Sequence, residues 1–287
     1  MRKKLVIATR GSKLALAQAH QVQDELKKIN VDTEILVVHT KGDKDRNSAL
    51  KEIGGDGLFV REIEKAILAG EADIAVHSGK DLPYNLADGL VIAGVSKAAD
   101  CRDCLISAKG KEELNIIGTG SPRRILEYKR ANPDAKFREI RGNITTRLRK
   151  LHDGECDAVI LAAAGLRRLN IDLSPYDVHE FSAEEMMPAA CQGIIAIECR
   201  QEDSDVVKAV RKMTHRHSWK RFNIERRLFR IMEADCSMAV GIHAEVDGDK
   251  LILSAMFEGR RVEKTGTYLN GEKLCAEIKK EIFRGQL

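Results

Sequence analysis

The sequence predicts an α/β fold in which two α/β domains precede a small α+β domain. Up to about Lys212, short apolar runs alternate with segments whose apolar residues recur at helical spacing, which is typical of α/β folds with mainly parallel sheets. Beyond that point the pattern changes to two longer runs around a turn dipeptide, which indicates a hairpin. Hydrophobic residues make up 43% of the 287 residues and charged residues 32%, a composition that excludes wholesale disorder.

The first domain is predicted to begin with a buried strand at residues 5–8. Ser12 then caps a helix over residues 13–28, and a second strand follows at residues 34–38. The polar stretch from Lys41 to Gly57 is long enough to suggest a functional loop. The remaining elements are a helix and a strand, expected at residues 58–67 and 73–76.

The later elements follow the same logic. The second domain is expected to contain strands at residues 115–118 and 157–161, a helix that starts at Pro122 and a helix that runs through Leu169. In the third domain, two strands flank the turn dipeptide Asp247-Gly248 and a helix closes the chain. The strands of that hairpin are expected at residues 240–246 and 251–257. The predicted domains are residues 1–95 with 194–211, residues 99–187, and residues 215–287.

The most basic part of the chain is the segment from Gly118 to Lys150, with a local net charge of +7. At its start, Ser121 can cap a helix that follows a strand, Pro122 suits the first helical position, and the adjacent glycines let backbone N–H groups approach a ligand. Such a helix start with neighbouring guanidinium groups favours a carboxylate or phosphate site. The guanidinium groups belong to Arg123, Arg124, Arg141 and Arg147. The alternative is a solvated basic helix surface, and a P-loop is disfavoured because no Gly-Lys-Ser/Thr ending is present.

Two further strand ends carry polar side chains. Ser78, Lys80 and Asp81 follow the strand at residues 73–76, where Asp81 could stabilise a developing cation and Lys80 could hold a carboxylate. The alternative is an aspartate-containing turn before a proline. Arg10 lies in a similar strand–helix turn, for which simple helix capping is the alternative.

Cysteine usage and overall charge limit the function classes. Seven cysteines, an odd number at low density, predict a reduced cytoplasmic protein without a disulfide scaffold. Cys101 and Cys104 form one C-x-x-C without a partner pair, so no metal site is expected. Cys236 lies in a predicted loop before a strand and is a possible covalent attachment point. Neither an export signal nor a membrane span is expected. A net charge of +4 is too small to argue for nucleic-acid binding.

Taken together, several short motifs resemble the porphobilinogen deaminase family over nearly the whole chain. Their order and separations make chance agreement implausible. The motifs are Ile7-Ala8-Thr9-Arg10-Gly11-Ser12, Gly54 to Phe59, Asp73 to Ser78 with Lys80-Asp81, Gly118 to Arg124, Arg141-Gly142-Asn143, Leu161 to Leu169, and Cys191-Gln192-Gly193.

This resemblance implies an enzyme with two domains like those of periplasmic binding proteins and a third domain that carries a cysteine. In the family, that cysteine holds a dipyrromethane cofactor through a thioether, and here its position matches Cys236. Four porphobilinogen molecules are then added head to tail with loss of ammonia, and water releases hydroxymethylbilane in tetrapyrrole (heme) biosynthesis. The family expectation is a cytoplasmic monomer that needs neither nucleic acid, membrane nor metal.

The resemblance also implies roles for individual residues. Asp81 matches the catalytic aspartate, which stabilises positive charge on pyrrole nitrogens. The other matched residues hold the acidic side chains of the cofactor and the substrate. Those assigned to the cofactor, besides Cys236, are Ser78, Lys80, Thr119, Ser121, Arg123, Arg124 and Arg141, and those assigned to the substrate are Arg10, Arg147 and Arg168.

The sequence departs from the family pattern around the attachment cysteine. Asp235 stands just before Cys236 where glycine is usual, and no proline follows soon after. Cys191 also occupies a position usually filled by glycine. A second interpretation therefore stays open, a non-catalytic two-lobed anion-binding protein, which would share the serine, threonine and arginine turns.

Overall fold

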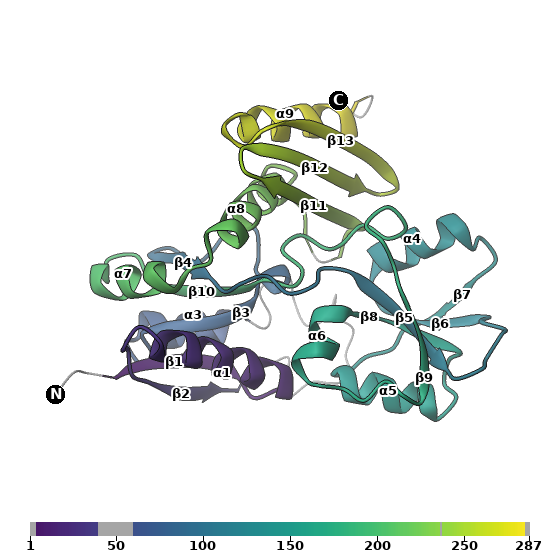
Figure 1. Ribbon diagram of the computed structural model, residues 1–287, viewed down its shortest axis with the longest axis horizontal. Coiled ribbons are helices and arrows are strands. Elements are labelled where there is room, and N and C mark those ends of the chain that lie inside the picture. The colour runs from purple at the N-terminus through teal and green to yellow at the C-terminus, as the bar shows by residue number, and fades with distance from the viewer. Residues whose placement is uncertain (1–3, 40–59, 236, 285–287) are drawn as a thin grey trace. The chain divides into compact units, whose positions relative to one another are not determined.

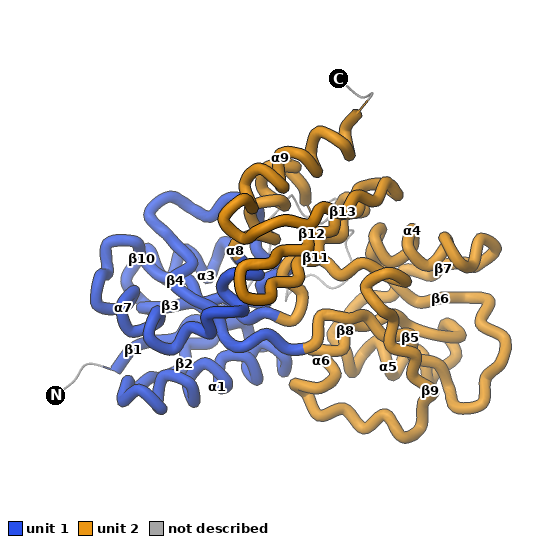
Figure 2. Tube along the Cα trace, turned by 45° about the horizontal axis from the view of Figure 1, so that its top comes forward, with its two compact units in different colours: residues 1–99, 194–222 blue, residues 100–193, 223–287 orange. Residues whose placement is uncertain are grey.

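The computed structural model describes residues 4–39, 60–235 and 237–284, and its helices and strands are arranged around three sheets (Figure 1). The chain divides into two compact units (Figure 2). Unit 1 comprises Met1–Ala99 and Ile194–Phe222, and unit 2 comprises Asp100–Gly193 and Asn223–Leu287. The predicted loop from Lys41 to Gly57 and the predicted attachment residue Cys236 lie outside the described residues.

Unit 1 is built on a five-stranded sheet with the order β2-β1-β3-β10-β4. β1 pairs in parallel with β2 and β3, whereas β10 runs antiparallel to both β3 and β4. The strands are β1 (Leu5–Arg10), β2 (Thr33–Val38), β3 (Ile74–Ser78), β4 (Leu90–Val95) and β10 (Ile195–Arg200). The helical elements are α1 (Lys13–Lys27), α3 (Arg61–Leu68), the short 3₁₀ turn η1 (Gly79–Asp81) and α7 (Ser204–Met213).

The two faces of this sheet bury different helices, because successive residues of a strand point to opposite sides. Ile7 of β1 packs in a cluster with Leu26 of α1 and Val210 of α7. Its neighbour Ala8 packs in a separate cluster with Ile67 of α3. Unit 1 is therefore a three-layer α/β arrangement, and the carboxyl ends of its parallel strands β1 and β3 share one edge of the sheet.

Unit 2 contains a second five-stranded sheet with the order β7-β6-β8-β5-β9 and a three-stranded antiparallel sheet with the order β11-β12-β13. In the larger sheet β6 is parallel to β7 and β8, and β5 is antiparallel to β8 and β9. Its strands are β5 (Asp103–Ala108), β6 (Ile116–Gly118), β7 (Lys136–Arg138), β8 (Ala158–Ala162) and β9 (Tyr176–Glu180), and its helices are α4 (Pro122–Ala131), α5 (Ile144–His152) and α6 (Ala163–Arg168).

The three-stranded sheet packs against helices through its own core. Leu251 and Leu253 of the middle strand lie in one buried cluster with Leu228 and Ile278. The elements are α8 (Arg216–Ile231), which runs from unit 1 into unit 2, β11 (Val240–Asp247), β12 (Lys250–Phe257), β13 (Arg260–Thr267), the 3₁₀ turn η2 (Tyr268–Asn270) and α9 (Gly271–Ile282).

The predicted α/β class, with two sheet-centred regions and a small C-terminal region of sheet and helix, is confirmed. In each five-stranded sheet four strands run in the same direction, which agrees with the expected mainly parallel sheets, and one reversed strand makes two antiparallel pairings. In unit 1 the reversed strand is β10, which enters the sheet between β3 and β4. The predicted boundaries of three domains stay a prediction. Within the described ranges, no helix has both the length and the apolarity that crossing a bilayer requires.

Candidate active site

Asp81 lies at the end of a short turn whose base is fixed by buried contacts. The turn η1 follows β3 directly, and the Gly79 N–H donates to the Ile194 carbonyl at 2.8 Å. Gly79 and Leu82 are buried, whereas Asp81 between them is exposed. The anchored backbone therefore presents the Asp81 side chain to solvent at the carboxyl end of β3. The sequence predicted this placement at the end of a strand.

A buried polar pair lies just before this turn. His77 Nε2 is 2.9 Å from Glu198 Oε2 of β10, and the two residues are 6% and 0% exposed. Glu64 of α3 is also buried, and burial raises the pKa of its carboxyl, with the negative charge of Glu198 acting in the same direction. Sequence analysis did not single out Glu198, because its partner is 121 residues away in the chain.

The turn at residues 9–12 fulfils the helix-capping role. Ser12 Oγ accepts a hydrogen bond of 3.2 Å from the Ala15 N–H at the start of α1. The hydroxyl of Thr9, which is fully buried, donates to the Ala15 carbonyl at 3.3 Å. Arg10 ends β1 between these two residues and is partly exposed. Its predicted role in binding substrate carboxylates stays a prediction.

In unit 2 the turn at residues 118–124 has the predicted local structure. Ser121 is the N-cap of α4 and accepts from the Arg124 N–H, with Pro122 in the first turn. Thr119 Oγ1 accepts from the Ser121 N–H at 3.2 Å, which fixes the loop between β6 and α4. Gly118 is required by packing, since a Cβ there would lie 2.5 Å from Ile140 Cδ1. The residues that follow Gly118 therefore connect β6 to α4 through a turn held by these hydrogen bonds.

Both arginines that follow this cap are buried and bind the same carboxylate. Arg123 Nη2 donates to Asp103 Oδ2 at 2.8 Å, and Arg124 Nη2 donates to Asp103 Oδ1 at 2.7 Å. The other Nη groups donate to the carbonyl oxygens of Met187 and Ile160 at 2.6 and 2.8 Å. Burial lowers the pKa of Arg123, and the Arg124 cation adds to this effect while Asp103 opposes it.

This cluster carries one more positive than negative charge. Arg124 Nε is buried and has no hydrogen-bond partner among the described residues. A buried guanidinium with an unused N–H donor fits an acidic group that binds here, because unpaired buried donors are rare and costly. The residues present therefore fit a cofactor that bears carboxylates, as dipyrromethane does.

Three more predicted arginines of unit 2 each have a protein contact. Arg141 Nε donates to Glu139 Oε1 at 2.7 Å, and Arg147 Nε donates to the Gly142 carbonyl at 2.8 Å. Arg168 Nη2 donates to the Gly193 carbonyl at 2.7 Å. These contacts orient the three guanidinium groups within unit 2.

The predicted site residues fall into two groups. Arg10, Ser78, Lys80 and Asp81 belong to unit 1, and Thr119, Ser121, Arg123, Arg124, Arg141, Arg147 and Arg168 belong to unit 2. Within unit 1, the turn at residues 78–81 brings the hydroxyl, the ammonium and the carboxylate onto one short segment. Within unit 2, Asp103 joins the two buried arginines. Asp103 itself was missed, although an acid that opens an otherwise apolar strand was a usable signal.

The described cysteines differ in burial. Cys101 is partly exposed, whereas the other described cysteines are buried. Burial raises the pKa of Cys104 to about 12 and that of Cys156, Cys199 and Cys275 to about 11. No group of three or more possible metal ligands occurs among the residues described. Near the predicted attachment point, Asp235 Oδ1 accepts from the Ser237 N–H at 2.6 Å.

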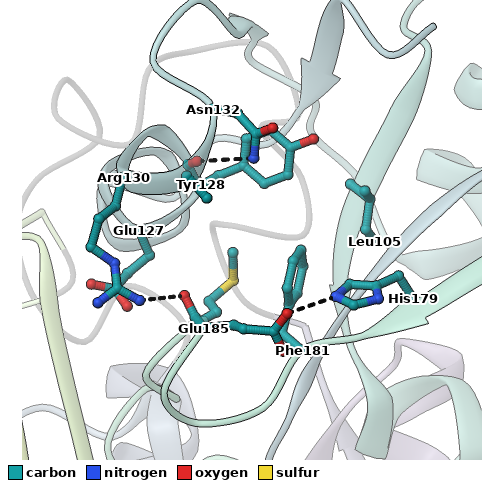
Figure 3. Close-up of a pocket in the computed structure, with 10 residues that line it drawn as sticks. Leu105, Glu127, Tyr128, Arg130, Asn132, His179, Phe181 and Glu185 are labelled. Atoms are coloured by element: carbon teal, nitrogen blue, oxygen red, sulfur yellow. Dashed lines mark hydrogen bonds and ion pairs between the residues drawn. The ribbon is translucent and has the colours of Figure 1, made fainter.

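A pocket of about 270 Å³ in unit 2 contains none of the predicted site residues (Figure 3). Tyr128 and Phe181 form aromatic walls, and their rings meet edge to face with centroids 6.3 Å apart. At its rim His179 Nε2 is 3.3 Å from Glu185 Oε1, and Arg130 Nη2 donates to the Glu185 carbonyl at 3.0 Å. Because no predicted site residue lines it, the pocket is not part of the predicted site.

Solved structures of similar shape are distant from this chain. The periplasmic VFT2 domain of Bordetella pertussis BvgS is 14% identical, with a TM-score of 0.45, and the match covers 73% of this chain and 86% of that domain. A likeness of this extent carries no argument about activity.

Sequence comparison is far more specific. The family model described as "Porphobilinogen deaminase, dipyromethane cofactor binding domain" matches residues 5–208. The porphobilinogen deaminase of Acetivibrio thermocellus is 38% identical over 292 residues, which cover 98% of this chain and 99% of that protein. That of Streptococcus sanguinis is 39% identical over 88% of this chain and 86% of its own length. Agreement of this extent, along almost the full length of both proteins, places the chain in the porphobilinogen deaminase family.

Proposed function

We propose that Asp81 is the catalytic group of this enzyme, and that the turns rich in arginine and hydroxyl side chains hold its acidic substrate and cofactor. The reaction joins four porphobilinogen molecules head to tail with loss of ammonia and releases hydroxymethylbilane. Each porphobilinogen carries an acetate and a propionate, so the growing product accumulates carboxylates. The reaction therefore needs many anion-binding groups and a group that stabilises positive charge.

The observation that carries the proposal is the exposure of Asp81 on an anchored turn. Its neighbours Gly79 and Leu82 are buried, and Gly79 is hydrogen-bonded to Ile194. A carboxylate fixed in this way can stabilise a developing cation without first reorganising its own backbone. We assign it to the pyrrole nitrogen of the substrate, which becomes positive as ammonia leaves.

Anion binding is assigned to the remaining predicted residues. Ser78 and Lys80 stand on the same turn as Asp81 and supply a hydroxyl and an ammonium. Arg123 and Arg124 supply the buried excess charge beside Asp103, and the Arg124 Nε donor is unused by the described residues. The other assigned residues are Arg10, Thr119, Ser121, Arg141, Arg147 and Arg168. Guanidinium groups suit this task because they bind carboxylates with two parallel hydrogen bonds.

The attachment residue is proposed to be Cys236. When bound, dipyrromethane supplies the primer to which the first substrate unit is joined. The buried thiols are poor candidates, because burial raises the pKa of Cys104, Cys156, Cys199 and Cys275 to about 11 or 12 and the thiolate is the nucleophile.

The experiment that tests this function is the intact mass of the purified full chain together with its consumption of porphobilinogen. We expect the chain to be heavier than its sequence by two linked pyrrole units, and the Cys236→Ser variant to lack this addition. Cys101→Ser is the matched control and should keep it. An unmodified parent chain that consumes no porphobilinogen would leave the non-catalytic anion-binding interpretation in its place.

The cellular setting is part of the same proposal. Seven cysteines, an odd number at low density, favour a reducing compartment such as the cytoplasm. The monomeric state is proposed from the family resemblance, and light scattering on the purified chain measures it directly.

A further inference from the structure

Gln18 of α1 is a buried polar side chain with a partner at the candidate site. It is 3% exposed, although helix α1 has a solvated face to which a glutamine could point. Its Nε2 lies 2.8 Å from Ser78 Oγ, and its Oε1 lies 3.2 Å from the same oxygen. The two residues are 60 positions apart in the chain. The contact is therefore a tertiary one between α1 and the end of β3.

The backbone on the Ser78 side is fixed independently of this contact. Ser78 is in register with Ile195 in the antiparallel pair of β3 with β10, and the next N–H, that of Gly79, donates to the Ile194 carbonyl. The direction of the Ser78 side chain is thus the main freedom that remains. Among the described residues, the Gln18 carboxamide forms the hydrogen bond that limits the direction of the Ser78 hydroxyl.

The distances favour one arrangement of hydrogens. At 2.8 Å, the Gln18 amide N–H donates to Ser78 Oγ, which uses a lone pair of the hydroxyl and leaves its own proton available. In the alternative, at 3.2 Å, the hydroxyl donates its proton to Gln18 Oε1 and offers only lone pairs to a ligand. Only the first arrangement suits a carboxylate, which accepts hydrogen bonds and repels lone pairs.

We infer that Gln18 is a positioning residue that holds the Ser78 hydroxyl as a hydrogen-bond donor toward a carboxylate of the cofactor or substrate. The inference rests on the proposed role of Ser78 and adds to it the residue that determines the polarity of that hydroxyl. Gln18 itself does not touch the reacting atoms. It acts through Ser78, so its effect must disappear when the hydroxyl is removed.

The test is a double-mutant cycle with Ser78→Ala and Gln18→Leu in the full chain. Two quantities are measured: the initial rate at which cofactor-free chain gains the two-pyrrole mass when incubated with limiting porphobilinogen, and KM and kcat of the loaded enzyme. Loss of a hydrogen bond to a charged group corresponds to about a ten- to hundredfold change. We expect Ser78→Ala to slow loading or raise KM within that range, and Gln18→Leu to cause part of the same change.

The decisive comparison is the effect of Gln18→Leu in the Ser78→Ala background. We expect no further loss there, with kcat less affected than KM. An equal loss in both backgrounds would show that Gln18 acts independently of Ser78 and would overturn the inference while the role of Ser78 stands. If Ser78→Ala changes neither loading nor KM, the proposed role of Ser78 is wrong and the inference goes with it.

The Gln18→Glu variant should give the loading rate a pH dependence that a purely structural role of Gln18 would not produce. The new carboxylate has the same shape but only accepts hydrogen bonds, so it takes the Ser78 proton and repels the ligand. The loading rate relative to the parent chain should recover as the pH is lowered, because the protonated carboxyl can donate again. A ratio that is independent of pH would contradict the assignment. Gln21→Glu is the matched control: Gln21 lies in the same helix, and its Nε2 contacts Glu25 Oε1 at 2.9 Å instead of Ser78.

Discussion

Arg123 Nη2 lies 2.8 Å from Asp103 Oδ2 in a pair whose side chains are 5% and 0% exposed. Asp103 is the one carboxylate shown bonded to both Arg123 and Arg124 in the described residues, and Gln192 Nε2 also donates to it at 3.1 Å. A single buried acid thus fixes the start of α4 to β5. The orientation of both guanidinium groups depends on that acid.

The first prediction concerns the stability that this acid provides. Asp103→Asn should lower the free energy of unfolding by about 3–5 kcal/mol, because it leaves two buried cations without their counter-charge. Urea denaturation followed by circular dichroism measures the change. Asp134→Asn, at an exposed position of the same unit, should change it by less than about 0.5 kcal/mol. Equal stability of the two variants would contradict the buried pairing.

The second prediction concerns catalysis at the exposed turn. Asp81→Asn should lower kcat by about 10²–10³-fold, since an amide stabilises a cation far less than a carboxylate does. The melting temperature should stay close to that of the parent chain, because Asp81 is exposed. Steady-state kinetics and a thermal melt on the same preparation check both parts. Near-parental turnover would remove Asp81 from the mechanism.

The third prediction is a pH dependence of stability that arises from Glu64. The pKa of Glu64 is raised above its ordinary value of 4.5, first by burial and then by the charge of Glu198. The folded chain therefore holds this proton more tightly than the unfolded chain, and the stability linked to Glu64 falls as the pH rises through the raised pKa. Glu64→Gln imitates the protonated state at every pH.

We therefore expect Glu64→Gln and the parent chain to unfold at similar denaturant concentrations near pH 4, with the variant gaining relative stability toward pH 7. Denaturant titrations at a series of pH values measure this difference. Glu71→Gln, at an exposed position, serves as the control. A difference that shrinks with rising pH has the opposite sign and would contradict the assignment.

The fourth prediction concerns thiol reactivity. At pH 8 a thiol whose pKa is about 11 is ionised in about one molecule in a thousand. An alkylating reagent should therefore label the partly exposed Cys101 well before Cys156, Cys199 and Cys275 in the folded chain. Peptide mass spectrometry of samples taken over time gives the order. Simultaneous labelling of all four thiols in folded chain would show that the burial described here is wrong.

Local sequence patterns predicted the parts of the structure that depend on local interactions. Ser121 as a cap, Pro122 in the first turn of α4 and the turn at Asp247-Gly248 are all confirmed. Each depends on hydrogen bonds or backbone angles within a few residues. The strands and helices that were predicted agree with the described residues to within a few positions, whereas others, such as β4, β5 and β10, were not predicted.

Interactions between distant segments were not predictable in this way. The +7 charge of the basic segment suggested either a solvated surface or an anion site, whereas its first two arginines are buried against Asp103, which lies outside that segment. The contact of Gln18 with Ser78 and that of His77 with Glu198 span 60 and 121 positions. No local pattern contains the partner in such a pair, so the residue types were identified and their partners were not.

The place of β10 in its sheet has a consequence for synthesis on the ribosome. β10 lies between β3 and β4, although it follows them by about a hundred residues of chain that belong to unit 2. The amino-terminal sheet therefore cannot close until that intervening segment has been made, which takes roughly 5–20 s at typical translation speeds. During this interval β3 has an unpaired edge and β4 has no partner strand, and unpaired strand edges of this kind promote aggregation.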